Sequence, residues 1–451
     1  MADSEIGVVR LVGGTALTPH QLIRDMSLAI SNGRIVSLSG RVPISGGDVP
    51  SHEETPSLPQ TRAGQDTLPS QEPHGGFNES ITIDTKGMTI LPGLINIHDH
   101  LLGTWHSKIG GGPYPNVYRW LKAVEYHPLR IECKKNTEED IYLLGAYKNL
   151  FSGVTTVLDH YIRYDPDFYQ ALPLRVIHEF GRTWTLREET GWGGTIEEEF
   201  SRTNGRQPYV IHIAEGVDGE ARSELAALER RGVLARNTVL VHAIALSDQE
   251  IELIAQRGAT VAWCPASNIF LYGATANLPE LLSSGVNVAI GTDSSWSGSA
   301  NLLEEILLEE ILYARRCAEE VFGLPLDART ILSMVTTNAA TGLQRSGEIG
   351  ALAPGYLADI LVLEGEESDP YQRAVRANPE DIDLLLLEGR PVLGSIRHED
   401  IASARLSSFS RVKVNGREKF VAGDPIALRE RMWEVSGTVK RFPFLPIARA
   451  E

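Results

Sequence analysis

The chain has 451 residues, of which 42% are hydrophobic and 22% are charged, and this composition is typical of a globular protein. Its 59 acidic and 42 basic residues give a formal net charge of −17, and the basic residues form no sizeable block. Such a chain is not expected to bind nucleic acid or an anionic membrane surface. The length allows one large domain together with a smaller one.

The cysteine content and the N-terminal sequence bear on the cellular compartment. Cys133, Cys264 and Cys317 are odd in number and far apart, which argues against a disulfide framework. The stretch MADSEIGVVRLVGG lacks the pattern of a secretion signal, and no apolar run approaches the roughly 18 residues of a membrane span. We therefore expect a cytoplasmic protein.

The first part of the chain combines short strands with a segment of different composition. Residues 5–40 have strand patterning, and Asn32-Gly33 is typical of a hairpin turn. Residues 43–79 contain six of the 24 prolines of the chain and almost no aromatic residues. This segment is too polar and too rich in proline to bury a core, so we predict a disordered insertion.

Residues 91–345 alternate short apolar runs with helical patterns. Ser247 and Glu250 can form a capping box at the start of one helix, and residues 301–323 have the pattern of an amphipathic helix. Such alternation predicts a (β/α)8 barrel, distorted around its fourth strand, for which RTWTLREE is the best candidate. The other strands are predicted at residues 94–100, 154–159, 174–180, 209–214, 239–242, 260–263 and 286–291.

The C-terminal part returns to strands and hairpin turns in GYLADILVLEG and DIDLLLLEGRPVLG. Strands at both ends of the chain, with a barrel between them, suggest one further domain built from the two termini. We predict that residues 1–90 and 346–451 form this small β-sandwich domain, with a tail at the C-terminus.

Histidines and an aspartate stand at the ends of several predicted strands. His98 and His100 share one face of their strand, because alternate residues point the same way, while Asp99 points away. The pair alone is weak evidence, since two histidines can also be structural. Three further strand ends carry a histidine or an aspartate: His212, His242 and Asp293. Because barrel enzymes carry their active sites at this end of the strands, the set favours a metal site.

These motifs, with TTNAATGL and GEIGALAPGYLADILVLEG after them, resemble the amidohydrolase superfamily over nearly the whole chain. The HxxE formed by His212 and Glu215, and the segment VAWCPASNIFLYG, are similar to its deaminase and chlorohydrolase branch. Relatives with two metal ions usually bridge them with a carbamylated lysine, and here no lysine occurs between Lys148 and Lys413. We therefore expect a single divalent metal ion.

The resemblance implies roles for the strand-end residues. The metal ligands would be His98, His100, His212 and Asp293, with zinc as the expected ion and ferrous iron as the alternative. A zinc ion lowers the pKa of bound water to about 7, which supplies hydroxide at neutral pH. His242 would hydrogen-bond this hydroxide or the oxyanion, Asp293 would also help to accept the water proton, and Glu215 would act as general acid and base.

Further residues are candidates for contact with the substrate, because they follow the ends of the early strands or the aspartate. The sequence does not distinguish this role from simple covering of the barrel mouth. The candidates are Trp105, His106, His160, His178 and Trp296.

The resemblance implies a metal-dependent hydrolase of carbon–nitrogen bonds in a small nitrogen-rich compound. Deamination of an aminated heterocycle or cyclic amidine is the first expectation. Hydrolysis of an amide or a cyclic imide or urea, or the reverse ring closure, is an alternative within the class. A non-catalytic binding protein on the same fold is a second alternative, opposed by the complete ligand set. A homodimer is the family expectation.

Overall fold

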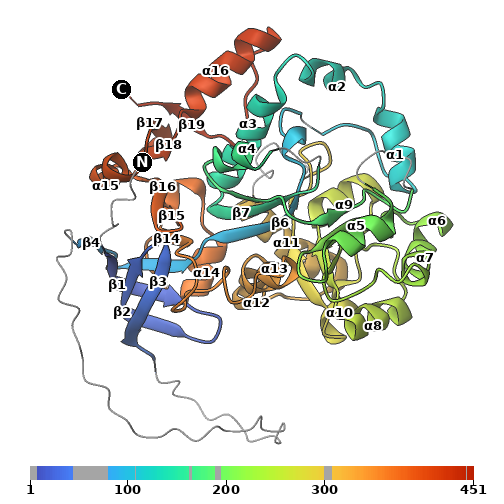
Figure 1. The fold of residues 1–451 in the computed structure, drawn as a ribbon, viewed down its shortest axis with the longest axis horizontal. Helices are drawn as coiled ribbons and strands as arrows, with labels where there is room; N and C mark the ends of the chain where they lie inside the picture. Colours follow the sequence, from blue (N-terminus) through green and yellow to red (C-terminus); the bar gives the residue numbers. More distant parts are fainter. Residues whose placement is uncertain are drawn as a thin grey trace, which may run out of the picture.

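The computed structural model describes residues 8–43, 80–106, 108–161, 165–187, 194–298, 307–442 and 444–450, and for residues 307–309 the backbone alone. The predicted insertion at 43–79 lies outside the described residues, apart from its first residue. The same holds for residues 301–306 of the predicted amphipathic helix. Figure 1 shows the strands of the two chain ends gathered on one side of the molecule, and the central parallel strands with their helices on the other.

The central part contains two parallel sheets, so the predicted α/β class is confirmed. One sheet has the strand order β6-β7-β8 and the other has the order β13-β12-β11-β10-β9. A parallel bridge between Asp99 and Asp293 links the first strand to the segment after the last. The strands are β6 (Leu94–Asp99), β7 (Val154–Asp159), β8 (Arg175–Ile177), β9 (Gly181–Arg182), β10 (Tyr209–Ile213), β11 (Thr238–His242), β12 (Thr260–Trp263) and β13 (Asn287–Ile290).

These strands lie within a few residues of their predicted positions and are almost wholly buried. Every residue of β6, β7, β10, β11 and β12 is buried, as expected for parallel strands covered on both faces. The fourth strand, β9, is short and begins one residue before the predicted RTWTLREE. The pairing with β10 nevertheless continues beyond it, because Thr183 N donates to Val210 O and His212 N donates to Trp184 O.

Helices connect the parallel strands. The predicted capping box at Ser247 is present, and α8 ends at Gly258 in the left-handed conformation. The helices are α1 (Val117–Val124), α2 (Pro128–Cys133), α3 (Glu138–Leu150), α4 (Pro166–Gln170), α5 (Ile196–Arg202), α6 (Gly219–Arg222), α7 (Glu224–Arg230), α8 (Asp248–Arg257), α9 (Pro265–Tyr272), α10 (Leu278–Ser283), α11 (Leu307–Phe322), α12 (Ala328–Met334) and α13 (Thr337–Gly342). Among the described residues, none of the helices has the length and apolarity required to cross a bilayer.

The described residues of the two chain ends form one 11-stranded sheet, here called the terminal sheet. Its order is β19-β17-β18-β16-β15-β14-β5-β1-β2-β3, with β4 paired to β1. The strands are β1 (Val9–Leu17), β2 (Leu22–Ser31), β3 (Arg34–Arg41), β4 (Ile81–Asp84), β5 (Met88–Pro92), β14 (Ile360–Glu364), β15 (Ile382–Leu387), β16 (Arg390–Ser395), β17 (Phe409–Val414), β18 (Arg417–Ala422) and β19 (Ile447–Arg449). Helices α14 (Pro370–Val375), α15 (Glu399–Arg405) and α16 (Pro425–Ser436) belong to the same C-terminal part.

The predicted hairpin at Asn32-Gly33 is present between β2 and β3. Both turn residues have positive φ, 48° at Asn32 and 73° at Gly33, as a two-residue hairpin turn of this kind requires. The strands of the two chain ends meet where β5 pairs with β14 in antiparallel register, from Met88 opposite Glu364 to Pro92 opposite Ile360.

Candidate metal and catalytic site

The histidines and the aspartate that end separate strands converge on one buried centre. His98 lies in β6, His212 in β10 and His242 at the end of β11, while Asp293 follows β13. The side chain of each is almost wholly buried. Two of these residues have left-handed backbones, with φ of 70° at His242 and 57° at Asp293. Such conformations are uncommon for residues with a side chain and concentrate at functional sites.

A glycine allows the last strand to approach the first. A Cβ added at Gly291 would lie 2.9 Å from the carbonyl oxygen of His98 and 2.8 Å from its Cβ. The approach is fixed by a hydrogen bond from Asp293 N to His98 O of 3.0 Å. Residues from opposite ends of the parallel set are therefore held side by side.

The spacing of the predicted ligand atoms fits a metal ion. Asp293 Oδ1 lies 3.4 Å from His98 Nε2 and 3.4 Å from His100 Nε2, and His100 Nε2 lies 3.4 Å from His212 Nε2. Tetrahedral zinc with bonds of about 2.0–2.1 Å places its ligands about 3.4 Å apart. Two overlapping groups have ligand atoms within 4.8 Å of one another: His98, His100, His160 and His212; and His98, His212, His242 and Asp293.

The histidine rings offer unprotonated nitrogen atoms to this centre. Burial lowers the pKa of His100 to about 3 and holds the pKa of His212 well below its usual range. His212 Nδ1 lies 2.9 Å from the carbonyl oxygen of Trp184, which fixes the hydrogen on Nδ1 and leaves Nε2 as the ligand atom. Neither ring nitrogen of buried His98 has a hydrogen-bond partner among the described residues. A metal ion would supply the missing contact.

The two carboxylate oxygens of Asp293 have different neighbours. Oδ2 accepts hydrogen bonds from Ser267 Oγ at 2.6 Å and from Ser297 Oγ at 2.8 Å, whereas Oδ1 faces the histidines. Burial alone would raise the pKa of this carboxyl group, but the contact with His98 and the other nearby histidines hold it well below the usual range. Asp293 is therefore an anion, as a metal ligand must be.

His242 is oriented by an amide on α9. The Asn268 amide donates to Thr275 Oγ1 at 3.2 Å, so its oxygen, Oδ1, faces His242 Nδ1 at 2.7 Å. Nδ1 therefore carries the hydrogen. The other nitrogen, Nε2, lies 3.5 Å from Glu215 Oε1 and 3.9 Å from Asp293 Oδ2, between the two acidic groups.

Glu215 lies beyond the end of β10, as the HxxE spacing predicts. The chain turns there, with φ of 51° at Ala214 and 151° at Gly216. Tyr272 donates a hydrogen bond of 2.5 Å to Glu215 Oε1, and Oε2 is buried with no hydrogen-bond partner among the described residues. Burial raises the pKa of Glu215 to about 7. A carboxyl group of this kind can give and take a proton near neutral pH.

Asp99, which the strand periodicity directs away from the metal centre, anchors β6 to α3. Lys148 Nζ donates to its Oδ1 at 2.8 Å, and Asn149 Nδ2 donates to its Oδ2 at 2.8 Å. Asn96 Nδ2 adds a contact of 3.2 Å to Asp99 and donates to Thr292 Oγ1 at 2.8 Å. The network fixes the strand that carries His98 and His100.

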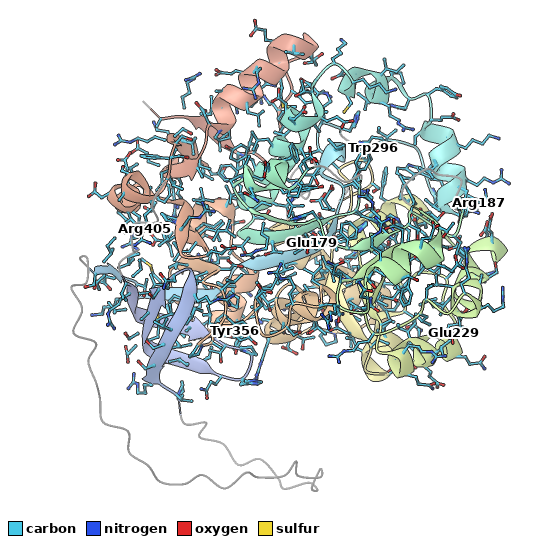
Figure 2. The ribbon with its side chains drawn as sticks, in the orientation of Figure 1. Glu179, Arg187, Glu229, Trp296, Tyr356 and Arg405 are labelled. Atoms are coloured by element: carbon cyan, nitrogen blue, oxygen red, sulfur yellow. The ribbon has the colours of Figure 1, made fainter. Side chains whose placement is uncertain are left out.

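A pocket of about 320 Å³ opens above these groups. Of the predicted substrate contacts only Trp296, which Figure 2 labels, is among the residues that line it. The residues that line it are His100, Leu102, Gly103, Val117, Trp120, Leu121, Arg130, Tyr161, Trp184, His212, Glu215, His242, Asp293, Ser294 and Trp296.

The remaining predicted substrate contacts lie elsewhere. Trp105 Nε1 donates to Glu132 at 3.1 Å, and the His106 ring meets the Trp296 ring edge-on at 4.9 Å. His160 stacks on His212 at 4.7 Å, and His178 stacks on Tyr169 at 4.7 Å. His160 thereby joins the metal centre rather than the pocket wall. A contact of these four residues with substrate stays a prediction.

Sequence reasoning did not single out several residues of the site. Ser267, Asn268 and Tyr272 lie within VAWCPASNIFLYG, so the resemblance of this segment to related enzymes could have identified them. Trp184 lies in the candidate for the fourth strand. Trp120 and Arg130 come from the long connection between β6 and β7, where no motif marks them.

Comparisons with known proteins agree with this geometry. The sequence model described as "Amidohydrolase family" matches residues 204–392. A 5-methylthioadenosine/S-adenosylhomocysteine deaminase of Thermococcus sibiricus is 27% identical over 374 residues, which are 69% of this chain and 84% of the relative. A 5′-deoxyadenosine deaminase of Methanopyrus kandleri is 27% identical over 402 residues, 79% of this chain and 85% of the relative.

Two solved structures have the same fold. An adenosine deaminase from Xanthomonas campestris with bound zinc has a TM-score of 0.67 and 18% identity, covering 96% of this chain and 98% of that one. A zinc complex of atrazine chlorohydrolase from Arthrobacter aurescens has a TM-score of 0.64 and 19% identity, covering 88% of this chain and 99% of that one. The sequence comparisons therefore confirm the predicted resemblance to the amidohydrolase family and its deaminases, and the two structures show that the fold is shared.

Proposed function

We propose that the chain is an amidohydrolase-family enzyme that deaminates a heterocycle with a metal ion. Its proposed substrate is a purine nucleoside or a close derivative with an amino group on the ring. The observation that carries this proposal is Glu215, a buried carboxyl group that lies next to His242 and lines the pocket, and one of its oxygens has no hydrogen-bond partner among the described residues. The names of the sequence relatives support a substrate of the adenosine type.

The residues proposed to hold the metal ion are His98, His100, His212 and Asp293, and zinc is the proposed ion, with ferrous iron as the alternative. When bound, the ion acts as a Lewis acid and activates water for attack on the ring carbon. A single ion is proposed because the sequence has no lysine between Lys148 and Lys413, and Lys148 itself is paired with Asp99.

Glu215 is the proposed proton carrier. In deamination, water adds its oxygen to the carbon that bears the amino group, and that carbon releases ammonia. Protonation of the adjacent ring nitrogen by Glu215 makes the carbon more electrophilic, and a later proton transfer lets the amino group leave as a neutral molecule. The pKa of about 7 allows Glu215 to perform both transfers near neutral pH.

His242 and Asp293 handle the proton and the charge on the water side. Because the Nδ1 hydrogen of His242 is committed to Asn268, Nε2 is the atom that exchanges a proton with the reacting oxygen and bonds to the oxyanion. Asp293 Oδ2 is held by two serine hydroxyl groups, so its position is fixed for accepting the water proton. Preorganised polar groups of this kind stabilise charge that develops in the transition state.

Several finer features belong to the same proposal. The two parallel sheets, joined between Asp99 and Asp293, would form one (β/α)8 barrel over residues 91–345. The terminal sheet would form the small β-sandwich domain from residues 1–90 and 346–451. A cytoplasmic location and a homodimer stay predictions, as does the absence of nucleic-acid and membrane partners.

The test is ammonia release by the zinc-loaded protein from adenosine, 5′-deoxyadenosine and a panel of aminated heterocycles, with product mass measured in parallel. Replacement of an amino group by oxygen in a purine nucleoside supports the proposal, and Asp293→Asn should abolish the reaction. The exposed Glu252 offers a matched control, Glu252→Gln, which should react as the wild type does. Gain of one water without ammonia would instead assign hydrolysis of an amide or a cyclic urea.

A further inference from the structure

One side chain in the pocket has no part in the proposed reaction. Arg130, in α2, lines the same pocket as Glu215 and Asp293. Its guanidinium carbon lies 5.0 Å from the centre of the Trp296 ring. Among the described residues that line this pocket, it is the one lysine or arginine. A cation therefore shares this pocket with aromatic and aliphatic side chains, two acidic groups and three histidines.

Among the residues that the structure describes, no anionic group is paired with Arg130. Its side chain is half-buried and makes no ion pair with any residue that the structure describes. The neighbouring cation, Lys440, differs in this respect, because its Nζ lies 2.8 Å from Glu132 Oε1. Removing an arginine from water without an anionic partner is unfavourable, so such a residue in a pocket indicates a partner that arrives with the ligand.

The electrostatic influence of Arg130 reaches the surroundings of Trp296. Burial, followed by the positive charges of Lys440 and Arg130, lowers the pKa of His106 to about 3. His106 packs edge-on against Trp296, and Trp120 meets Trp296 at 6.5 Å on another side. The neutral imidazole adds no second cation, and Arg130 is the one lysine or arginine among the described residues of the pocket lining.

We infer that Arg130 recognises an anionic oxygen group on the substrate, so that the enzyme prefers an aminated ring carrying a carboxylate or a phosphate over its neutral analogue. The inference rests on the proposed function and names a narrower substrate class for the same site. The planar guanidinium matches two oxygens of such a group, and its stacking on Trp296 fixes the orientation of the donors.

The experiment compares adenosine-5′-carboxylate with adenosine-5′-carboxamide, which differ in charge and hardly in shape, and adds adenosine 5′-monophosphate as the phosphate arm. With the zinc-loaded wild type, kcat/KM for at least one of the two anionic compounds, the carboxylate or the monophosphate, should exceed kcat/KM for the carboxamide about tenfold to a hundredfold. Arg130→Gln should remove the preference mainly through KM, and Arg130→Lys should restore part of it. The preference should also weaken as salt concentration rises.

Exposed Arg119, in neighbouring α1, provides the matched control, since it changes the same charge outside the pocket lining. Arg119→Gln should keep the wild-type preference. The inference is overturned if the wild type treats the anionic compounds and the carboxamide alike. It is also overturned if Arg130→Gln slows all of them equally, because the arginine would then only support the pocket wall.

A binding measurement separates this inference from the reaction. Calorimetry with inosine-5′-carboxylate and inosine-5′-carboxamide should show tighter binding of the carboxylate by the wild type and equal binding by Arg130→Gln. If no adenosine compound releases ammonia, the proposed substrate is wrong, yet this binding difference still supports the anion site. Ammonia release without any charge preference in rate or binding would leave the proposed function standing and reject the role of Arg130.

Discussion

The terminal sheet and the ends of the parallel strands differ in whether their buried polar groups have hydrogen-bond partners. In the terminal sheet, Asp383 accepts hydrogen bonds from Arg397 at 2.8 and 2.6 Å and lies 2.8 Å from His398 Nε2. Buried Lys419 donates to Ile382 O at 2.6 Å. At the strand ends, His98 and Glu215 Oε2 are buried with no such partner among the described residues.

The difference separates groups that maintain the fold from groups reserved for a ligand. A buried polar group without a partner costs stability, about 1–3 kcal/mol for a neutral group, and folding alone gives no reason to keep it. Several such groups around one centre, at the ends of different strands, therefore point to an ion and a substrate. Saturated groups, such as Asp383, should matter for stability and not for the reaction.

The largest loss of activity is expected when a predicted metal ligand is replaced. His98→Asn removes a predicted ligand, and loss of Lewis acid catalysis should lower the rate of ammonia release by about 10³-fold or more. Metal content after dialysis should fall in parallel. The thermal unfolding midpoint of the apoprotein should change little, because no described residue makes a hydrogen bond to the His98 ring that would be lost. Full metal content with a normal rate would contradict the assignment.

A smaller loss of activity is expected when Glu215, the proposed proton carrier, is replaced. Glu215→Gln keeps the shape and the acceptor for Tyr272 but cannot transfer a proton, so kcat should fall about 10²- to 10⁴-fold. Bound metal should stay at the wild-type level, which distinguishes this variant from His98→Asn. Glu224 is a buried carboxyl group nearby, bonded to Tyr118 and Ala214 N. Because these bonds saturate it, Glu224→Gln should act on stability more than on the rate.

In the terminal sheet the expected effect is on folding. Asp383→Asn leaves Arg397 and His398 without their anion and should lower the free energy of unfolding by about 2–3 kcal/mol, measured by urea denaturation. The rate of ammonia release at low temperature should be unchanged. A slowed reaction in a fully folded variant would contradict the distinction between groups that maintain the fold and groups that serve the reaction.

The Asp383 contribution should also depend on pH. Burial opposes ionisation, but the contacts with His398 and Arg397 lower the pKa of Asp383 below its usual 3.8. The stabilisation is therefore complete above about pH 4 and decreases as pH falls through the lower pKa of the folded state. The difference between wild type and Asp383→Asn should shrink over the same range.

The smallest effect tests a saturated polar group on the same half of the molecule as the active site. Ser247 caps α8 by accepting from Glu250 N, and Glu250 accepts from Ser247 N in return. Ser247→Ala should cost about 1 kcal/mol of stability, seen as a lower urea midpoint. Ammonia release should be unaffected, although Ser247 lies only five residues after His242.

Local patterns predicted the framework of the site well. The apolar runs located the parallel strands, and alternation within a strand explained why Asp99 points to Lys148 while His98 points to the metal centre. The capping box at Ser247 and the hairpin at Asn32-Gly33 were also confirmed, since each depends on residues that are neighbours in the sequence.

The pocket walls could not be predicted in the same way. Trp120 and Arg130 come from the connection after β6, on α1 and α2, and their positions depend on how these helices pack against Trp296, which follows β13. His178 illustrates the opposite error of local reasoning. It follows a strand at the expected end, yet its ring stacks on Tyr169 of α4 outside the pocket lining.

The pairing of β5 with β14 has a consequence for how the protein is made. During synthesis, Met88–Pro92 leaves the ribosome long before Ile360–Glu364, its antiparallel partner. At about 5–20 residues per second the delay is on the order of tens of seconds. During this time β1, β2 and β3 can pair with one another, but the edge of β5 that later pairs with β14 has no partner strand and can attach to other chains. Expression should therefore depend on chaperones that shield this nascent edge until Ile360–Glu364 emerges.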